Sequence, residues 1–256
     1  MLLFKKKYKY IFLVIPLVIL FRYDLVFFSE TMEGNVGEIF LMHLFGGSYQ
    51  MEKANLTISV TGLIGIMYLT LLFADYVIHD MTEGAEYIFS RATGRSKWYK
   101  KKLCGLLGYC NLGVLLYIFF YIWVGIRETE QGLQKKDVLL MICTYIMLVL
   151  FTYCSILCIN MLSLIYSITI GVVIYYSMVV ISSMAMILIQ GISNPILSSV
   201  LHRINPMSNV LVSWNFSDFY VIWAMGYYSI LAMMLGLVLW KRVKNYEIGV
   251  DKGRGV

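Results

Sequence analysis

The sequence predicts an all-α, polytopic membrane protein with six transmembrane helices, and three observations lead to this fold class. Hydrophobic residues make up 60% of the 256 residues and charged residues only 14%, against roughly 25% charged in an ordinary soluble domain. The mean hydropathy is +0.75. The segment Val138–Leu201 contains no Asp, Glu, Lys, Arg or His. We therefore expect residues 1–256 to form one transmembrane domain of a multi-pass protein in the cell membrane.

Six apolar segments are long enough to cross the bilayer, because about 20 apolar residues in a helix span its ~30 Å hydrocarbon core. A turn within Asn160–Ser167 is expected to join spans four and five, although neither Gly nor Pro marks it. Asn194-Pro195 and Asn205-Pro206 are turn-initiating dipeptides, and they predict two short helices at the outer surface between spans five and six. The predicted spans are about 10–28, 56–79, 103–126, 138–161, 166–190 and 219–240.

The basic residues predict the orientation of these spans, because cytoplasmic segments carry an excess of Lys and Arg. Fifteen of the 21 basic residues fall on the termini and on the connection between spans two and three. This asymmetry predicts that both termini are cytoplasmic. The six basic residues expected outside are Arg22, Lys53, Arg127, Lys135, Lys136 and Arg203.

The longest polar segment between two apolar ones is Asp80–Lys102, which opens acidic and closes basic. It lies between the uncharged segments Leu56–Ala74 and Leu103–Ile126. We interpret it as the cytoplasmic loop between spans two and three. Because it is the only sizeable patterned surface expected on that side, it is where we expect a soluble partner to bind.

The sequence lacks the motifs of common membrane enzymes. It has no GxxxxGK[ST] phosphate loop, no HExxH zinc motif, and no serine nucleophile paired with a histidine inside a span. All five cysteines fall inside predicted spans, so we expect neither a disulfide nor a metal site. We predict no catalytic residue and no cofactor bound by this chain.

One acidic cluster leaves a second interpretation open. Asp75, His79, Glu83 and Glu86 have the spacing of one helix face at the end of span two, where they would ligate a metal or act as acid and base. The simpler interpretation is a solvated acidic face. Asp75 is the residue of the four nearest the hydrocarbon, where a carboxylate is costly and often functional. It is therefore our candidate for a residue of a transport pathway.

The polar loop also carries a resemblance to a known family. The local pattern is Ile88-Phe89-Ser90-Arg91, then Gly94–Tyr99, and then the basic run Lys100–Lys102 leading into span three. With six spans, a short basic N-terminus and short outer helices, it resembles the permease subunits of type-2 ATP-binding-cassette exporters. The resemblance is to small Gram-positive bacterial members linked to lantibiotic or bacteriocin immunity.

The resemblance implies a division of labour. The loop between spans two and three would form a coupling helix on which a separate ATPase subunit docks, and that subunit would bind the ATP. A second permease subunit, identical or a sister, would complete the path. The implied cargo is a hydrophobic or amphipathic substrate such as an antimicrobial peptide, so this chain would not be an enzyme by itself. The docking residues implied are Tyr87, Ile88, Phe89, Arg91, Arg95 and Trp98.

Two other expectations accompany this interpretation, and two rival functions remain open. Lys100–Lys102 are expected to contact lipid headgroups, and no nucleic-acid partner is expected, because the basic residues lie beside span ends. The first rival function is a non-catalytic accessory or immunity protein that acts by sequestration. The second is an integral-membrane enzyme that uses Asp75, His79 and Glu83.

Overall fold

The computed structural model describes residues 10–11, 36–37, 40, 44, 63–82, 94–128, 133–210 and 218–245. In this part of the chain every regular element is a helix and no strand occurs. Four of the helices are long and apolar enough to cross a membrane. This confirms the all-α class and supports a protein that lies in a membrane. The prediction of exactly six spans reaches beyond the described residues.

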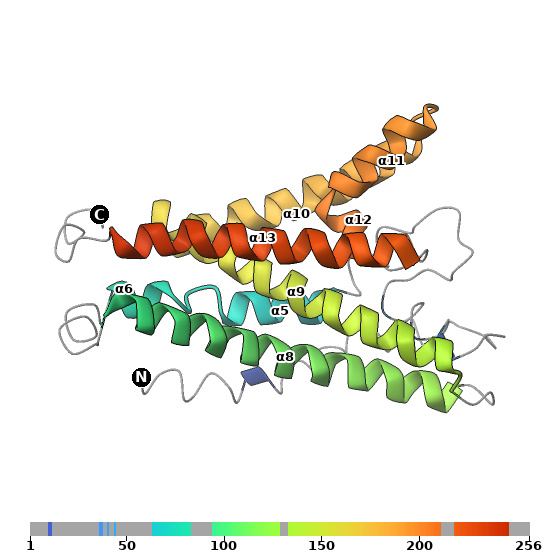
Figure 1. Ribbon diagram of the computed structural model, residues 1–256, viewed down its shortest axis with the longest axis horizontal. Helices are drawn as coiled ribbons and strands as arrows, with labels where there is room; N and C mark the ends of the chain where they lie inside the picture. Colours follow the sequence, from blue (N-terminus) through green and yellow to red (C-terminus); the bar gives the residue numbers. More distant parts are fainter. Residues whose placement is uncertain are drawn as a thin grey trace.

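The helices form a bundle from which one arm projects (Figure 1). The described helices are α5 (Ile64–Leu72), α6 (Ile78–Thr82), α8 (Arg95–Glu128), α9 (Lys135–Ile165), α10 (Ile168–Gln190), α11 (Pro195–Ile204), α12 (Pro206–Val210) and α13 (Asp218–Lys244). The four long helices α8, α9, α10 and α13 are those that can span the bilayer. They correspond to the predicted spans three to six.

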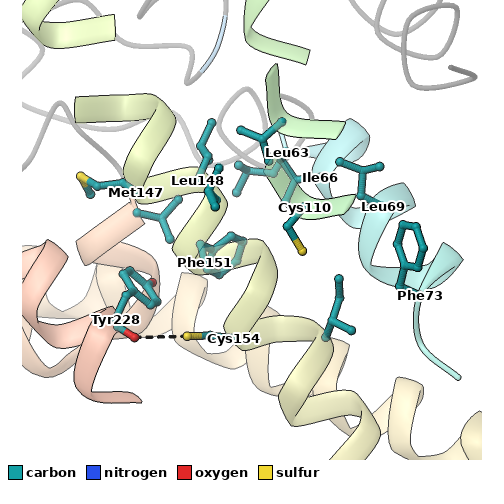
Figure 2. Packing of buried hydrophobic residues seen from close by; sticks show 14 of the residues in the cluster. Leu63, Ile66, Leu69, Phe73, Cys110, Met147, Leu148, Phe151, Cys154 and Tyr228 are labelled. Carbon is teal, nitrogen blue, oxygen red and sulfur yellow. Dashed lines mark hydrogen bonds between the residues drawn. The ribbon is translucent and has the colours of Figure 1, made fainter. Parts of the chain in front are cut away.

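Helix α9 is the centre of the bundle. It packs against α13, α10, α8 and α5, and it is the most buried of the four long helices. Figure 2 shows Leu148 and Phe151 of α9 facing Leu63 and Ile66 on one side and Tyr228 of α13 on the other. The other helices leave much of their apolar surface exposed, as expected where side chains face lipid.

Local sequence explains where the helices begin. The main-chain N–H of Gln134 donates to the Asp137 carboxylate (3.0 Å), which fixes the first turn of α9. The Ser167 hydroxyl accepts from the N–H of Ile170 (3.3 Å) and caps α10. The turn between α9 and α10 is therefore only Tyr166–Ser167, inside the predicted range. Asn160, which we had placed in that turn, lies instead within α9.

The two Asn-Pro dipeptides each start a short helix, as predicted. Asn194 accepts hydrogen bonds from the N–H groups of Ile196 and Leu197, with Pro195 in the first turn of α11. Asn205 accepts from the N–H of Met207 at the start of α12 (2.9 Å). The Asn205 amide also donates to the Ser182 carbonyl of α10 (2.8 Å). Helix α11 thus leads back along α10, and the pair forms the projecting arm (Figure 1).

The second predicted span differs from the prediction. Residues 56–79 were expected to form one continuous helix, but α5 ends at Leu72 and α6 begins only at Ile78. The five residues between them, Phe73–Val77, form turns. No proline or glycine lies in this stretch, so the interruption has its cause elsewhere in the fold.

We predict that glycines of the helices differ sharply in their tolerance of a methyl group. A Cβ at Gly171 of α10 would come 2.8 Å from the main-chain nitrogen of Ser163, whereas at Gly226 of α13 it would meet nothing within 4 Å. Gly171→Ala should lower the free energy of unfolding by about 1–3 kcal/mol through overpacking. Gly226→Ala should leave it unchanged or raise it by about 0.5–1 kcal/mol, because Ala favours a helix. Unfolding of the two variants in detergent measures this, and equal losses of stability would contradict the close α9–α10 packing.

Candidate functional site

The interruption between α5 and α6 is formed around the side chain of Asn160. In an unbroken helix the N–H of Val77 would donate to the carbonyl of Phe73 four residues earlier. Here the Asn160 oxygen accepts from the N–H of Val77 (2.9 Å), while its amide nitrogen donates to the Phe73 carbonyl (3.3 Å). The carboxamide of α9 is therefore inserted into the main-chain hydrogen-bond ladder of its neighbour, a recognised cause of a helix break.

Burial makes this insertion energetically important. Asn160 is 0% exposed, and its amide also donates to the Ile156 carbonyl within α9 (2.8 Å). Main-chain groups left without partners in the membrane cost several kcal/mol each. By satisfying one donor and one acceptor at once, Asn160 allows a non-helical stretch to exist inside the bundle.

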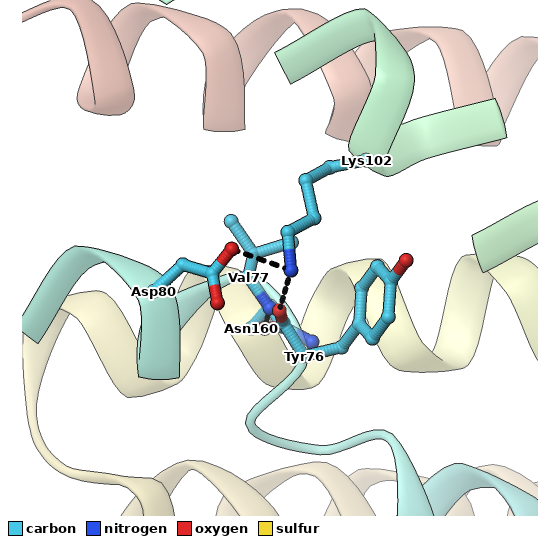
Figure 3. Close-up of polar contacts among 5 residues, drawn as sticks. All are labelled: Tyr76, Val77, Asp80, Lys102 and Asn160. Carbon is cyan, nitrogen blue, oxygen red and sulfur yellow. Dashed lines mark hydrogen bonds and ion pairs between the residues drawn. The ribbon is translucent and has the colours of Figure 1, made fainter. Parts of the chain in front are cut away.

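A lysine closes the same interruption from the side of α8. The Lys102 ammonium lies 2.6 Å from the Asp80 carboxylate of α6 and donates to the Tyr76 carbonyl (3.4 Å) (Figure 3). It also lies 4.4 Å from the centroid of the Tyr76 ring, at cation–π distance. The Lys102 and Asp80 side chains are only 14% and 12% exposed, so their charges depend on each other. We call Phe73–Asp80, with Asn160 and Lys102, the helix-break site.

Aromatic packing holds the break against α8. The rings of Phe73 and Tyr109 stack with centroids 5.2 Å apart, and the Tyr76 ring meets Tyr109 edge-on at 6.0 Å. A Cβ at Gly105 would come 2.8 Å from the Tyr76 hydroxyl. The glycine at this position of α8 thus makes room for the tyrosine of the interrupted helix.

Of the predicted acidic face, the structure describes Asp75 and His79. Asp75 lies in the turn before α6, half-buried, and its carbonyl accepts from the N–H of His79 in α6 (2.9 Å). This is the i to i−4 hydrogen bond of a helix, so the main chain from Asp75 to His79 keeps the helical spacing that was expected. Glu83 and Glu86 lie outside the described residues. Among the residues that are described, no three His, Cys, Asp or Glu side chains are placed to hold a metal ion.

Two of the predicted docking residues lie on α8 rather than in a loop. Helix α8 begins directly after Gly94, whose φ of +111° suits glycine. The guanidinium of Arg95 donates to the carbonyl of Lys244 at the end of α13 (2.7 Å), and half-buried Trp98 packs against the core. Both therefore have structural contacts within the chain. The other predicted docking residues, Tyr87, Ile88, Phe89 and Arg91, lie outside the described residues.

The two residues that hold the break, Lys102 and Asn160, were not predicted from the sequence. Lys102 was assigned to lipid headgroups with its neighbours Lys100 and Lys101, yet it is the only one of the three that is not fully exposed. Asn160 was read as a turn residue. Its signal was its polar amide within a long uncharged apolar segment, where an amide must find partners.

We predict that Lys102 and Lys101, adjacent in sequence, differ in their effect on stability. Lys102→Met leaves the Asp80 carboxylate and the Tyr76 carbonyl without their cation and should cost about 2 kcal/mol. Lys101→Met removes an exposed charge and should change stability by less than about 0.5 kcal/mol. Adding Asp80→Asn to Lys102→Met should restore part of the loss, since it removes the uncompensated charge. A double variant that loses the full sum of both single effects would show that the two residues do not interact.

Comparison with known proteins gives no family for this chain. No family model, no curated protein and no solved structure matches it. The function therefore has to be argued from the helix-break site and from the arrangement of the helices around it.

Proposed function

We propose that this chain is the transmembrane permease subunit of an ATP-binding-cassette exporter, with six spans and both termini in the cytoplasm. A separate ATPase subunit supplies the energy, and a second permease subunit completes the path. Four span-competent helices support this architecture. The start of α8, the end of α13 and α6 lie together at one end of the bundle (Figure 1). The basic residues of α8 and α13 at that end support its assignment to the cytoplasmic side.

The observation that carries the proposal is the position of the helix-break site. The connection from α6 to α8 is the segment to which the resemblance assigns ATPase docking. It runs from Thr82, the last residue of α6, to Arg95, the first residue of α8, and the ion pair of Asp80 and Lys102 joins these two helices. A force applied to the connection would therefore reach Phe73–Val77 and, through Asn160, the central helix α9. An interrupted helix that can rearrange is an established way to change access in a membrane protein.

The exposed apolar faces support a hydrophobic or amphipathic substrate and a second permease subunit. Helices α10 and α13 present large side chains outward, among them Ile181 (64% exposed) and Met233 (68% exposed). In a membrane such faces meet lipid, a partner helix or an apolar cargo. We propose that the cargo is a peptide with antimicrobial activity and that Asp75, half-buried at the break, is the polar residue of the pathway.

The accessory-protein alternative shares the membrane bundle but needs no energy source. An accessory protein would have no ATPase partner, and this property distinguishes it from a transporter subunit. The enzyme alternative would use Asp75 and His79, whose main chains are joined by a hydrogen bond at helical spacing (2.9 Å), together with Glu83, which lies outside the described residues. We therefore design the test around the partner.

The test is co-purification of an ATPase with the tagged chain from its native membrane. We expect a P-loop ATPase to co-purify, and Phe89→Ala to reduce its amount at least fivefold, because a desolvated apolar anchor is worth about 2 kcal/mol or more. The matched control is Lys136→Ala at the opposite end of the bundle, which should retain the full amount. Hydrolysis of ATP by the purified complex, and its stimulation by candidate peptides, gives a second readout.

Two results would contradict the proposal. If no ATPase co-purifies with the unaltered chain, the accessory-protein function replaces the transporter. If an ATPase co-purifies equally with Phe89→Ala and with the Arg91→Glu, Arg95→Glu double variant, the connection between α6 and α8 is not its docking site.

A further inference from the structure

The first turns of α8 and the last turns of α13 are fastened together at one end of the bundle. The Tyr99 hydroxyl donates to the Gly236 carbonyl (2.6 Å), and the rings of Tyr99 and Trp240 lie with centroids 5.3 Å apart. Arg95 donates to the Lys244 carbonyl at the last turn of α13 (2.7 Å). A cation at a helix C-terminus is favourable by itself. These contacts give two helix ends far apart in sequence a fixed relative position.

Where these contacts hold α8 against α13, a group of basic side chains faces outward. Tyr99 of α8 and Val243 of α13 are buried, whereas the basic residues beside them in sequence are exposed. Over residues 95–104 and 236–245 there is no Asp or Glu. The exposed cations are Lys97, Lys100, Lys101, Lys241, Arg242 and Lys244. We call these six residues the basic surface.

The basic surface lies beyond the apolar segments of α8 and α13. Helix α8 has 34 residues, about 51 Å at 1.5 Å per residue, which exceeds the ~30 Å of the hydrocarbon core. Its apolar part begins at Leu103, so the preceding basic turns project beyond the hydrocarbon. Half-buried Trp98 and Trp240 stand beside the cations, as aromatic residues do at a membrane interface.

We propose that the basic surface binds anionic phospholipid in the leaflet that faces this end of the bundle. Each Lys or Arg near an anionic membrane surface contributes about 1 kcal/mol, so six cations held on two adjoining helices can retain several phosphodiester headgroups. The long side chains let the charges reach the phosphates while their methylene groups stay against the protein. An acidic protein surface would be attracted too, but the flanking tryptophans and the continuity with spanning helices favour lipid. This inference does not depend on the transporter function.

The test compares lipid binding by the full chain purified in detergent. Phosphatidylglycerol is titrated against phosphatidylcholine, and bound lipid is counted by native mass spectrometry. We expect phosphatidylglycerol to bind the unaltered chain at least tenfold more tightly than phosphatidylcholine, with affinity that falls as salt is raised. The variant Lys100→Gln, Lys101→Gln, Lys241→Gln, Arg242→Gln should lose most of this preference. Inorganic phosphate at the same concentration should not displace the lipid, which separates a headgroup in a membrane from a free anion.

The matched control is Lys135→Gln with Lys136→Gln, two exposed lysines at the start of α9, at the opposite end of the bundle. It should retain the preference. If the quadruple variant does not fold, Lys100→Gln with Lys101→Gln and Lys241→Gln with Arg242→Gln are measured separately, each with an expected several-fold loss. Equal binding of phosphatidylglycerol by the unaltered chain and the variants would overturn the proposal. So would an equal loss in the control, or a variant that keeps its lipid but loses a bound protein partner.

Discussion

The carboxamide of Asn160 replaces a main-chain hydrogen bond in a neighbouring helix, and the inner part of the bundle depends on this replacement. A helix can be interrupted within a membrane protein only where other groups take over its freed donors and acceptors. Asn160 is suited to this because its amide offers an acceptor to Val77 and a donor to Phe73. An aliphatic side chain of similar size would leave the N–H of Val77 without this acceptor, and the Phe73 carbonyl would keep only the N–H of Tyr76 as a donor (3.1 Å).

Because Asn160 lies on α9, the interruption is connected to the central helix of the bundle. Asn160 joins the interruption to helix α9, which packs against α5, α8, α10 and α13. Lys102 closes the same stretch from α8 through Asp80 and the Tyr76 carbonyl. Two side chains therefore hold the break: the uncharged amide of Asn160 on the central helix α9, and the ammonium group of Lys102 on α8. This arrangement is what makes a conformational response to a docked partner physically plausible for the proposed transporter.

The extent of the long helices and the two short helices of the arm could be predicted from sequence, because hydropathy and Asn-Pro dipeptides are local signals. The interruption of span two could not, since Phe73–Val77 is as apolar and helix-compatible as its flanks except for Asp75. Its cause is a residue more than 80 positions away in the chain. Similarly, the basic run at Arg95–Lys102 was read as a loop from its charge, although Lys and Arg are good helix formers and Gly94 provides the start. In the candidate site, Asp75 was proposed from the sequence and lies in the interruption, whereas Asn160 and Lys102 could be found only from the tertiary contacts.

Hydrogen–deuterium exchange of the chain in lipid nanodiscs tests most directly whether Asn160 holds the break. The account predicts that a peptide covering Phe73–Val77 is protected in the unaltered chain to a degree close to that of α5, although it is not helical. In Asn160→Leu the same peptide should exchange at least tenfold faster, while peptides from α10 keep their protection. If Phe73–Val77 exchanges rapidly in the unaltered chain, or if Asn160→Leu leaves its exchange unchanged, the Asn160 amide does not hold the interrupted helix and the account fails.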